Sequence, residues 1–208
     1  MQFNERDLQR LIHALRSKGI GDERILKAFV SVPRHLFVPP GLEHKAYTDA
    51  ALPIGGSQTI SAPSTVAAML TALQLSSRDR VLEIGTGSGF QTALLTKLVA
   101  EVYSIERNLS LLKEVSERLV RAGCGTAHLR AGDGMLGWSE HAPYDAIIVS
   151  AGTEEVPSNL VDQLKPGSRM VIPLKGRINL ITKTRGGLRL RELSECQFVP
   201  LLPGHTES

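Results

Sequence analysis

Cysteines and long apolar runs are scarce in this sequence. No apolar stretch reaches the roughly 18 residues that a membrane-spanning helix needs, and the polar start Met-Gln-Phe-Asn-Glu-Arg is not that of a signal peptide. The two cysteines, Cys124 and Cys196, fit neither a disulfide framework nor a metal-ligand spacing. We therefore expect a cytoplasmic protein with no membrane partner and no bound metal.

A strong charge of one sign is also missing. The chain of 208 residues has 24 basic and 21 acidic side chains, a net charge of +3 without a charged block. Proteins that bind nucleic acid usually gather basic residues in a patch, so no nucleic-acid partner is expected. With 42% apolar and 22% charged residues, the composition is that of a globular protein. The length suits one domain over residues 1–208, which we expect to be monomeric.

A strand, a glycine-rich turn and a helix follow one another in the middle of the chain. Residues 80–84 form an apolar run that predicts a buried strand, and helical spacing resumes over residues 91–98. Between them stand Gly85, Gly87 and Gly89. Glycine adopts positive φ readily and lets a ligand lie against the backbone. This order is typical of the start of a doubly wound nucleotide-binding fold.

The spacing of these glycines indicates which ligand binds. A dinucleotide site has G-x-G-x-x-G, with a pyrophosphate at the helix start. Here the third glycine comes one residue early, and Glu83 precedes the first by two. An acid is a poor neighbour for phosphate and a good one for a cation. The pattern resembles the first motif of the S-adenosylmethionine-dependent methyltransferases, which implies that Glu83, Gly85, Gly87 and Gly89 bind the cofactor, the acid beside its cationic methionine end. The alternative is a turn that binds nothing.

Two further acids follow predicted strands. Glu106 ends the second strand, where a carboxylate can accept hydrogen bonds from both ribose hydroxyls; its alternative role is an ion pair with Arg107. Asp133 follows the third strand and can accept a hydrogen bond from an adenine amino group, with Gly134 leaving space for the ring. The alternative for Asp133-Gly134 is an ordinary turn.

Strands and helices alternate along the rest of the chain. Alternation of this kind predicts an α/β fold, a doubly wound and mostly parallel sheet of the Rossmann-like methyltransferase type. Residues 179–184 and 188–193 alternate around a glycine pair and predict an antiparallel C-terminal hairpin at the sheet edge. The predicted strands are residues 80–84, 101–106, 127–130, 144–150 and 168–173. The predicted helices include one opening at residues 61–64, one after Asn108 with Leu109, Leu112, Val115 and Leu119 inward, and one over residues 157–164.

The first part of the chain has a different character. Two helices, capped by Asn4 and Asp22, precede a proline-rich stretch at residues 33–41. Residues 42–60 look irregular, or contain at most one short strand, and so long a loop usually has a function. We divide the domain into an N-terminal helical and substrate-loop segment (residues 1–62), a cofactor-binding core (63–175) and a C-terminal hairpin and tail (176–208).

Three separate motifs narrow the reaction. Residues 32–39 read VPRHLFVP, residues 52–63 read LPIGGSQTISAP, and residues 198–201 read FVPL. Together they resemble the protein-L-isoaspartate O-methyltransferases, and the likeness runs from the first helix to Leu201. It implies methyl transfer from S-adenosyl-L-methionine to the α-carboxylate of L-isoaspartyl residues in damaged proteins and peptides, leaving S-adenosyl-L-homocysteine. It also implies that Ser61 is the catalytic residue. The residues that would shape or cover the acceptor pocket are Thr59, Ile60, Val199 and Pro200.

The chemistry is compatible with so few reactive groups. A carboxylate, with a free pKa of about 4, is already a nucleophile at neutral pH, and a serine hydroxyl can orient it with one hydrogen bond. The competing interpretation of Ser61 is a helix N-cap ahead of Ala62-Pro63. Two other functions stay open: a methyltransferase of the same fold acting on nucleic acid or a small molecule, and a non-enzymatic cofactor-binding module. Residues 150–153 replace the D/N-P-P-Y/F tetrad of amino-methylating enzymes, which argues against base amines.

Overall fold

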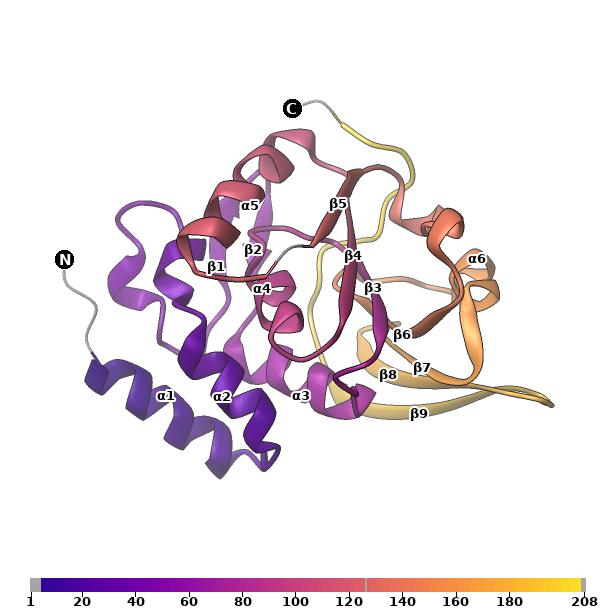
Figure 1. The fold of residues 1–208 in the computed structure, drawn as a ribbon, viewed down its shortest axis with the longest axis horizontal. Helices are drawn as coiled ribbons and strands as arrows, with labels where there is room; N and C mark the ends of the chain where they lie inside the picture. The colour runs from indigo at the N-terminus through magenta and orange to yellow at the C-terminus, as the bar shows by residue number, and fades with distance from the viewer. Residues whose placement is uncertain (1–4, 126, 207–208) are drawn as a thin grey trace.

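The structure of the protein is a computed structural model, and it describes residues 5–125 and 127–206. Nine strands and six α-helices are found in these residues (Figure 1). The strands are β1 (Leu52–Gly55), β2 (Gln58–Ile60), β3 (Arg80–Ile84), β4 (Glu101–Glu106), β5 (His128–Ala131), β6 (Tyr144–Val149), β7 (Leu164–Leu174), β8 (Arg177–Thr184) and β9 (Gly187–Glu195). The helices are α1 (Glu5–Ser17), α2 (Glu23–Ser31), α3 (Pro63–Leu73), α4 (Phe90–Thr96), α5 (Leu109–Arg121) and α6 (Ser158–Asp162).

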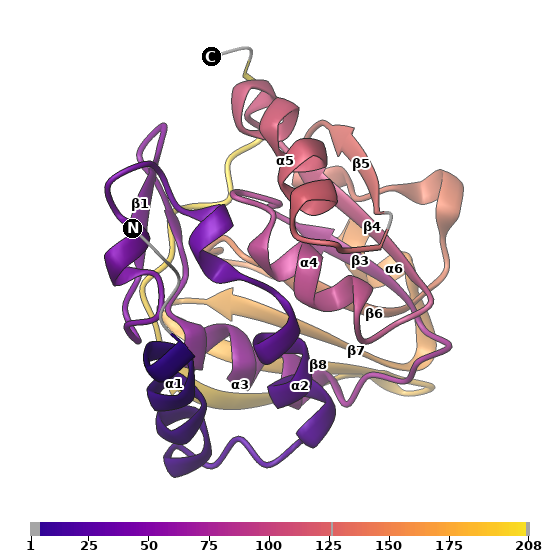
Figure 2. The ribbon, with the colours of Figure 1, turned by 60° about the vertical axis from the view of Figure 1, so that its left-hand side comes forward.

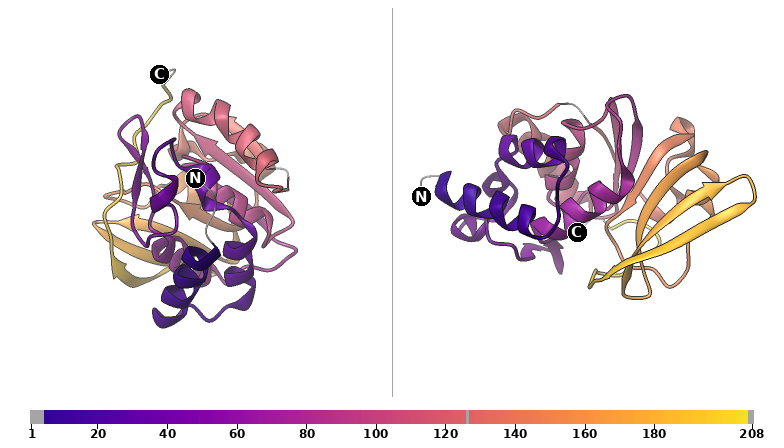
Figure 3. Two further views of the ribbon diagram at one scale, coloured as in Figure 1. Left: turned by 90° about the vertical axis from the view of Figure 1, so that its left-hand side faces the viewer. Right: turned by 90° about the horizontal axis from the view of Figure 1, so that it is seen from below.

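Seven strands form the main sheet, in the order β5-β4-β3-β6-β7-β8-β9. The five strands from β5 to β7 are parallel, and β8 and β9 continue the sheet antiparallel to their neighbours. The chain runs outward from β3 to β5 and then returns to the other side of β3 as β6. Ligands of doubly wound folds bind where the strand order reverses in this way. The predicted fold class, with its C-terminal hairpin and N-terminal helices, is confirmed (Figure 3).

The sheet separates two apolar cores. Val81 packs with α1 to α5 on one face, whereas Leu82, its neighbour in β3, packs with Leu160 of α6 on the other. Successive side chains of a strand point to opposite faces, so a strand buried on both sides must be apolar throughout. Figure 2 shows α1, α2 and α3 together on the face of the sheet that carries the first of these cores. The opposite face of the sheet is covered by α6 and short 3-10 turns.

The segment between the N-terminal helices and the main sheet is more regular than expected. Residues 52–60 form a two-stranded antiparallel sheet, β1 with β2, so the expectation of at most one short strand was wrong. Leu52 and Ile54 alternate with exposed neighbours and are buried, as is Ile60. Pro53 and the glycine pair at 55–56, which usually interrupt strands, hid this pattern in the sequence.

One boundary between a helix and a strand, and one buried helix face, also differ from the predictions. The helix predicted over residues 157–164 is only Ser158–Asp162, and residues 165–167 belong to β7. The buried face of α5 is formed by Leu111, Val115 and Leu119, so placing Leu109 and Leu112 inward was wrong. The predicted cap Asn4 lies outside the described residues.

The start of α3 overturns the capping interpretation of Ser61. The N-cap position is Ala62, which makes no side-chain capping bond. Asp49, distant in sequence, instead accepts a hydrogen bond from the Ser64 amide at 2.8 Å. The Ser61 hydroxyl is therefore not committed to the helix.

The cap of α2 gives a test of local stability. Asp22 accepts a hydrogen bond from the Arg24 amide at 2.9 Å, as predicted. Asp22→Ala should lower the free energy of unfolding in urea by about 1 kcal/mol. Asp22→Asn keeps a capping oxygen and serves as the control. Equal losses for both variants would show that the ion pair with Arg24, not the cap, stabilises this turn.

Candidate active site

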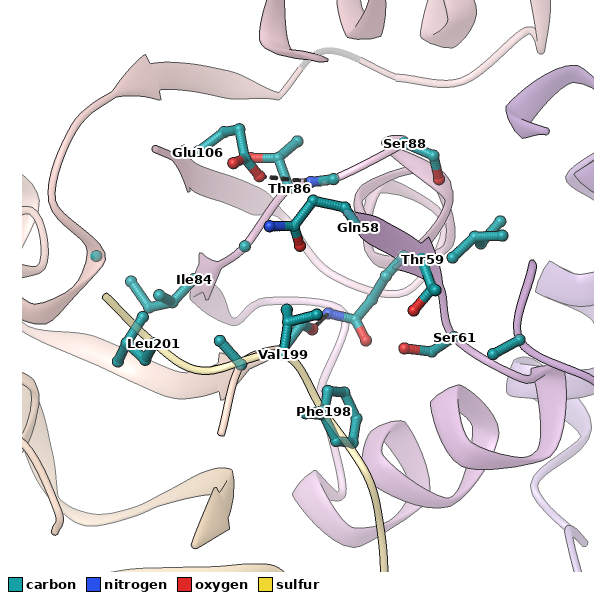
Figure 4. A pocket seen from close by; sticks show the side chains of 18 of the residues that line it. Gln58, Thr59, Ser61, Ile84, Thr86, Ser88, Glu106, Phe198, Val199 and Leu201 are labelled. Carbon is teal, nitrogen blue, oxygen red and sulfur yellow. Dashed lines mark hydrogen bonds between the residues drawn. The ribbon is translucent and has the colours of Figure 1, made fainter. Parts of the chain in front are cut away.

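A pocket opens at the carboxyl ends of β3, β4 and β6 (Figure 4). It holds about 1170 Å³ of empty space, part of it continuous with solvent. The turn after β3 forms one side, β2 and the start of α3 form another, and residues 196–202, which we call the C-terminal strap, form a third. The pocket therefore collects segments from the beginning, middle and end of the chain.

The floor of the pocket is the backbone of the glycine turn. Gly85 and Gly87 line it, with φ of +91° and +54°, in the left-handed region that favours glycine. The Gly87 amide donates to Oε2 of Glu106 at 2.8 Å, and the Asn108 amide donates to Oε1 at 2.9 Å. Glu106 also lines the pocket although it is only 5% exposed. Because a carboxylate already accepts from the turn, a phosphate there would meet an anion instead of a free amide.

Two of the singled-out glycines are required by packing. A Cβ on Gly89 would lie 2.7 Å from Val115 of α5, and Gly89 does not line the pocket. Gly134 does line it, but a Cβ there would lie 2.4 Å from Ile84. Real Cβ atoms do not approach so closely, so each position has a structural need for glycine whatever ligand binds.

Glu83 lies beneath the floor instead of in it. Its carboxylate is fully buried and accepts hydrogen bonds from Thr92 at 2.5 Å, Ser104 at 2.6 Å and Gln91 at 2.9 Å. Burial raises the pKa of Glu83 to about 7, against the opposing effect of these three donors. Gln91 also donates to Ser150, and both of these residues line the pocket. Glu83 therefore does not line the pocket itself, but it accepts a hydrogen bond from Gln91, which does.

Asp133 is similarly engaged by the backbone. Its Oδ1 accepts from the Met135 amide and its Oδ2 from the Gly204 amide, both at 2.8 Å. It is not among the pocket-lining residues. The contacts of this side chain connect the turn after β5 to Gly204.

The sides of the pocket formed by residues 59–61 and by the strap contain the residues singled out by resemblance. Thr59, Ile60 and Ser61 line it, and Figure 4 shows Thr59 and Ser61 opposite Val199 of the strap. The strap is held because the Gly152 amide donates to the Val199 carbonyl at 2.8 Å, and the Leu201 amide donates to the Gly152 carbonyl at 2.7 Å. These contacts place the N-terminal and C-terminal motifs on facing walls.

Several pocket residues carry no obvious signal in the sequence. Gln58, Gln91, Ser150 and Gln197 line the pocket. Sequence reasoning could have selected Gln58, which lies in the motif of residues 52–63, and Ser150, which directly follows β6. Among the described lining residues, the charged ones are Glu106 and its neighbour Arg107. No group of three potential metal-ligating side chains occurs within residues 5–125 and 127–206. None of the helices in that part of the chain is long and apolar enough to span a membrane.

A doubly wound sheet with an antiparallel edge, and an acid at the tip of β4 bound to a glycine turn, define the class of Rossmann-like methyltransferases. The family model described as Protein-L-isoaspartate(D-aspartate) O-methyltransferase matches residues 6–206, and the chain belongs to this family. It is 46% identical over 206 residues to a protein-L-isoaspartate O-methyltransferase of Pseudomonas paraeruginosa, covering 97% of this chain and 98% of the relative. A relative of that name from Dictyoglomus turgidum is 46% identical over 195 residues, covering 92% and 89%.

Solved structures support the same membership. One protein-L-isoaspartate O-methyltransferase superposes with a TM-score of 0.84 at 29% identity, covering 93% of this chain and 65% of that one. A putative protein-L-isoaspartate O-methyltransferase from Plasmodium falciparum, in complex with S-adenosyl-L-homocysteine, has a TM-score of 0.81 at 25% identity, covering 93% and 97%. The resemblance read from the motifs is thereby confirmed at the level of the family.

The buried Glu83 predicts a pH dependence of stability. Its pKa is raised from 4.5 to about 7 in the folded protein, so the stabilising effect is complete below pH 4.5 and is lost as the pH rises through 7. Between these limits the free energy of unfolding of the wild type should fall by about 3 kcal/mol relative to that of Glu83→Gln, which cannot ionise. Urea unfolding of both proteins across this range measures the difference. Parallel curves would contradict the raised pKa.

Proposed function

We propose that this protein transfers a methyl group from S-adenosyl-L-methionine to the α-carboxylate of L-isoaspartyl residues in damaged proteins and peptides, and so initiates their repair. The observation that carries the proposal is the placement of Ser61 in the pocket whose floor is the glycine turn. The family membership supports the reaction, and the lining of this pocket supports the choice of residues. The proposal includes a monomeric, cytoplasmic enzyme without a nucleic-acid partner.

The residues present fit a nucleoside that lacks phosphate. Each oxygen of Glu106 accepts one backbone amide and keeps a lone pair for a ribose hydroxyl. Ile84, Ile105 and Leu201 offer apolar surface in the same pocket. We assign cofactor binding to Glu106 and the backbone of Gly85 and Gly87, with Glu83, Gly89, Asp133 and Gly134 shaping the turns around it.

The bound cofactor supplies a methyl group already activated on a sulfonium. The protein therefore needs no strong base, because the acceptor carboxylate is ionised at neutral pH. Ser61, whose hydroxyl is free of the helix cap, donates a hydrogen bond that aims one carboxylate oxygen. The apolar surfaces of Ile60, Val199 and Pro200 exclude water from that oxygen. Alignment of the reacting atoms is the main contribution of these walls.

The product explains why methylation begins repair. Methoxide leaves an ester carbonyl far more readily than oxide leaves a carboxylate, so the neighbouring peptide nitrogen attacks the ester carbonyl, closes a succinimide ring and releases methanol, which takes up the nitrogen's proton. Hydrolysis of that ring returns part of the material as normal aspartate. The enzyme itself is required only for the first step.

A labelled-methyl assay tests the proposed function. Purified protein with methyl-labelled S-adenosyl-L-methionine should label an isoaspartyl peptide and leave its aspartyl twin unlabelled. Cofactor binding without label on either peptide would indicate a different acceptor. Failure to bind S-adenosyl-L-homocysteine in calorimetry would overturn the assignment of the glycine turn.

Two variants distinguish the role of the side with Ser61 from that of the side with Glu106. Ser61→Ala should lower kcat at least tenfold and leave the Kd of S-adenosyl-L-homocysteine within about twofold, because the hydroxyl faces the acceptor. Glu106→Gln should instead weaken that product at least tenfold, because it replaces an acceptor oxygen with a donor. Ser64→Ala, in the first turn of α3 outside the pocket lining, is the control. A parallel loss of cofactor affinity in Ser61→Ala would mean that this residue is only structural.

A further inference from the structure

The proposed function leaves one motif of the sequence unexplained. In the stretch VPRHLFVP, Arg34 begins a 3-10 turn (Arg34–Phe37) and is only 1% exposed. It does not line the pocket. An arginine buried so completely needs an explanation, because arginine is rarely found in a core without a partner.

The guanidinium of Arg34 contacts both the loop of residues 46–50 and Phe90, which are far apart in the sequence. Its Nε donates to the Ala46 carbonyl at 2.7 Å, and its Nη2 donates to the Ala50 carbonyl at 3.2 Å. Its central carbon lies 5.0 Å from the centre of the Phe90 ring. Next to it, Nδ1 of His35 lies 2.8 Å from the hydroxyl of Tyr47, in the same loop. The motif thus holds both ends of the loop of residues 46–50.

This loop leads to the acceptor wall, by which we mean the two facing sides of the pocket formed by residues 58–62 and by the C-terminal strap. It leads through Ala51, which lines the pocket, into β1, and β1 pairs with β2 so that Leu52 lies opposite Ile60. Asp49 of the loop accepts from the Ser64 amide and forms an ion pair with Lys18 at 2.5 Å. The loop is therefore connected to the chain on both sides of Ser61.

The opposite contact of Arg34 lies on the cofactor side. Phe90 follows the last glycine of the turn, begins α4 and lines the pocket. Its ring also packs edge-on against Phe37, in the same 3-10 turn as Arg34. One side chain therefore contacts the loop that leads to the acceptor wall and the residue that follows the cofactor floor.

The charge of Arg34 has a cost in stability. No carboxylate pairs with it among residues 5–125 and 127–206, and its Nη1 is buried there without a hydrogen-bond partner. Burial lowers the pKa of Arg34 to about 10. An apolar side chain of similar size would often be more favourable at such a place. We therefore attribute the presence of a guanidinium to the two carbonyl groups that it binds, and not to a gain in stability.

We propose that Arg34 is a positioning residue: it holds the loop of residues 46–50 against the first turn of α4, and so keeps the Ser61 wall in register with the cofactor floor. This inference rests on the proposed function for its kinetic consequence, whereas the loop contacts can be tested without activity. Lysine cannot replace arginine here, because an ammonium does not reproduce the planar fork that spans two carbonyls.

Arg34→Lys in the full-length enzyme is the principal test. A misplacement of about 1 Å at a reacting centre can lower a rate a hundredfold. We expect kcat/KM for an isoaspartyl peptide to fall at least tenfold, and the Kd of S-adenosyl-L-homocysteine to change less than threefold. Amide hydrogen exchange over residues 47–60 should accelerate at least tenfold, with exchange in β3 and β6 unchanged. Arg24→Lys is the matched control, because Arg24 donates to the Leu75 carbonyl at 2.8 Å and contacts neither segment.

The outcomes are distinguishable. Wild-type kinetics and wild-type exchange in Arg34→Lys would overturn the inference, and so would equal losses of peptide and cofactor binding, which indicate general destabilisation. If the variant does not fold, Arg34→Met keeps the volume and the apolar stem of the side chain in the core and removes both donors to the loop carbonyls; the same kinetic pattern is expected, and an unchanged kcat/KM would overturn the inference. If the wild type itself methylates no isoaspartyl peptide, the proposed function fails, and the exchange data alone decide the role of Arg34.

Discussion

The hydrogen bond from the Gly87 amide to the Glu106 carboxylate is the contact on which the site depends. At 2.8 Å it joins the turn after β3 to the tip of β4, in a region that is largely buried. A short charge-assisted bond of this kind holds the turn open toward the pocket. It also places negative charge where a dinucleotide fold would present a free amide to a phosphate. Dinucleotide folds carry an acid at the same strand tip, so the occupied amide of Gly87 and the close spacing of the three glycines, rather than the acid alone, argue against a phosphate here.

The rest of the pocket is organised around that fixed floor. The middle of the chain supplies the floor, and both sides of the acceptor wall come from elsewhere: β2 with Ser61 from the first third, and the strap at residues 196–202 from the end. Gly152 binds the strap through two backbone hydrogen bonds, while Asp49 and Arg34 hold the loop that leads to Ser61. Neither wall is part of the main sheet, so each depends on specific polar contacts for its position.

The sequence predicted what is decided locally. The order of strand, glycine turn and helix, the cap at Asp22 and the C-terminal hairpin depend on neighbouring residues, and the structure contains each of them. Features that depend on distant partners were not predictable. The cap of α3 comes from Asp49, 15 residues before Ser64, so Ser61 looked like the cap. Gly89 is required by its local φ of +88° and, in addition, by Val115 in another helix. The sequence marks Arg34 only as part of the motif of residues 32–39, and its burial and carbonyl partners are visible only in the structure.

The acceptor wall has a consequence for the end of the catalytic cycle. Its two sides, residues 58–62 and the strap at residues 196–202, contain no ionisable acid or base apart from the thiol of Cys196. Esterification converts the negatively charged carboxylate of the substrate into a neutral ester. If the wall contained an ammonium or a guanidinium, that group would then have an unpaired charge in a partly dehydrated space. In this protein no charged group of the wall has to be solvated or paired again when the ester departs. A neutral lining thus favours departure of the product.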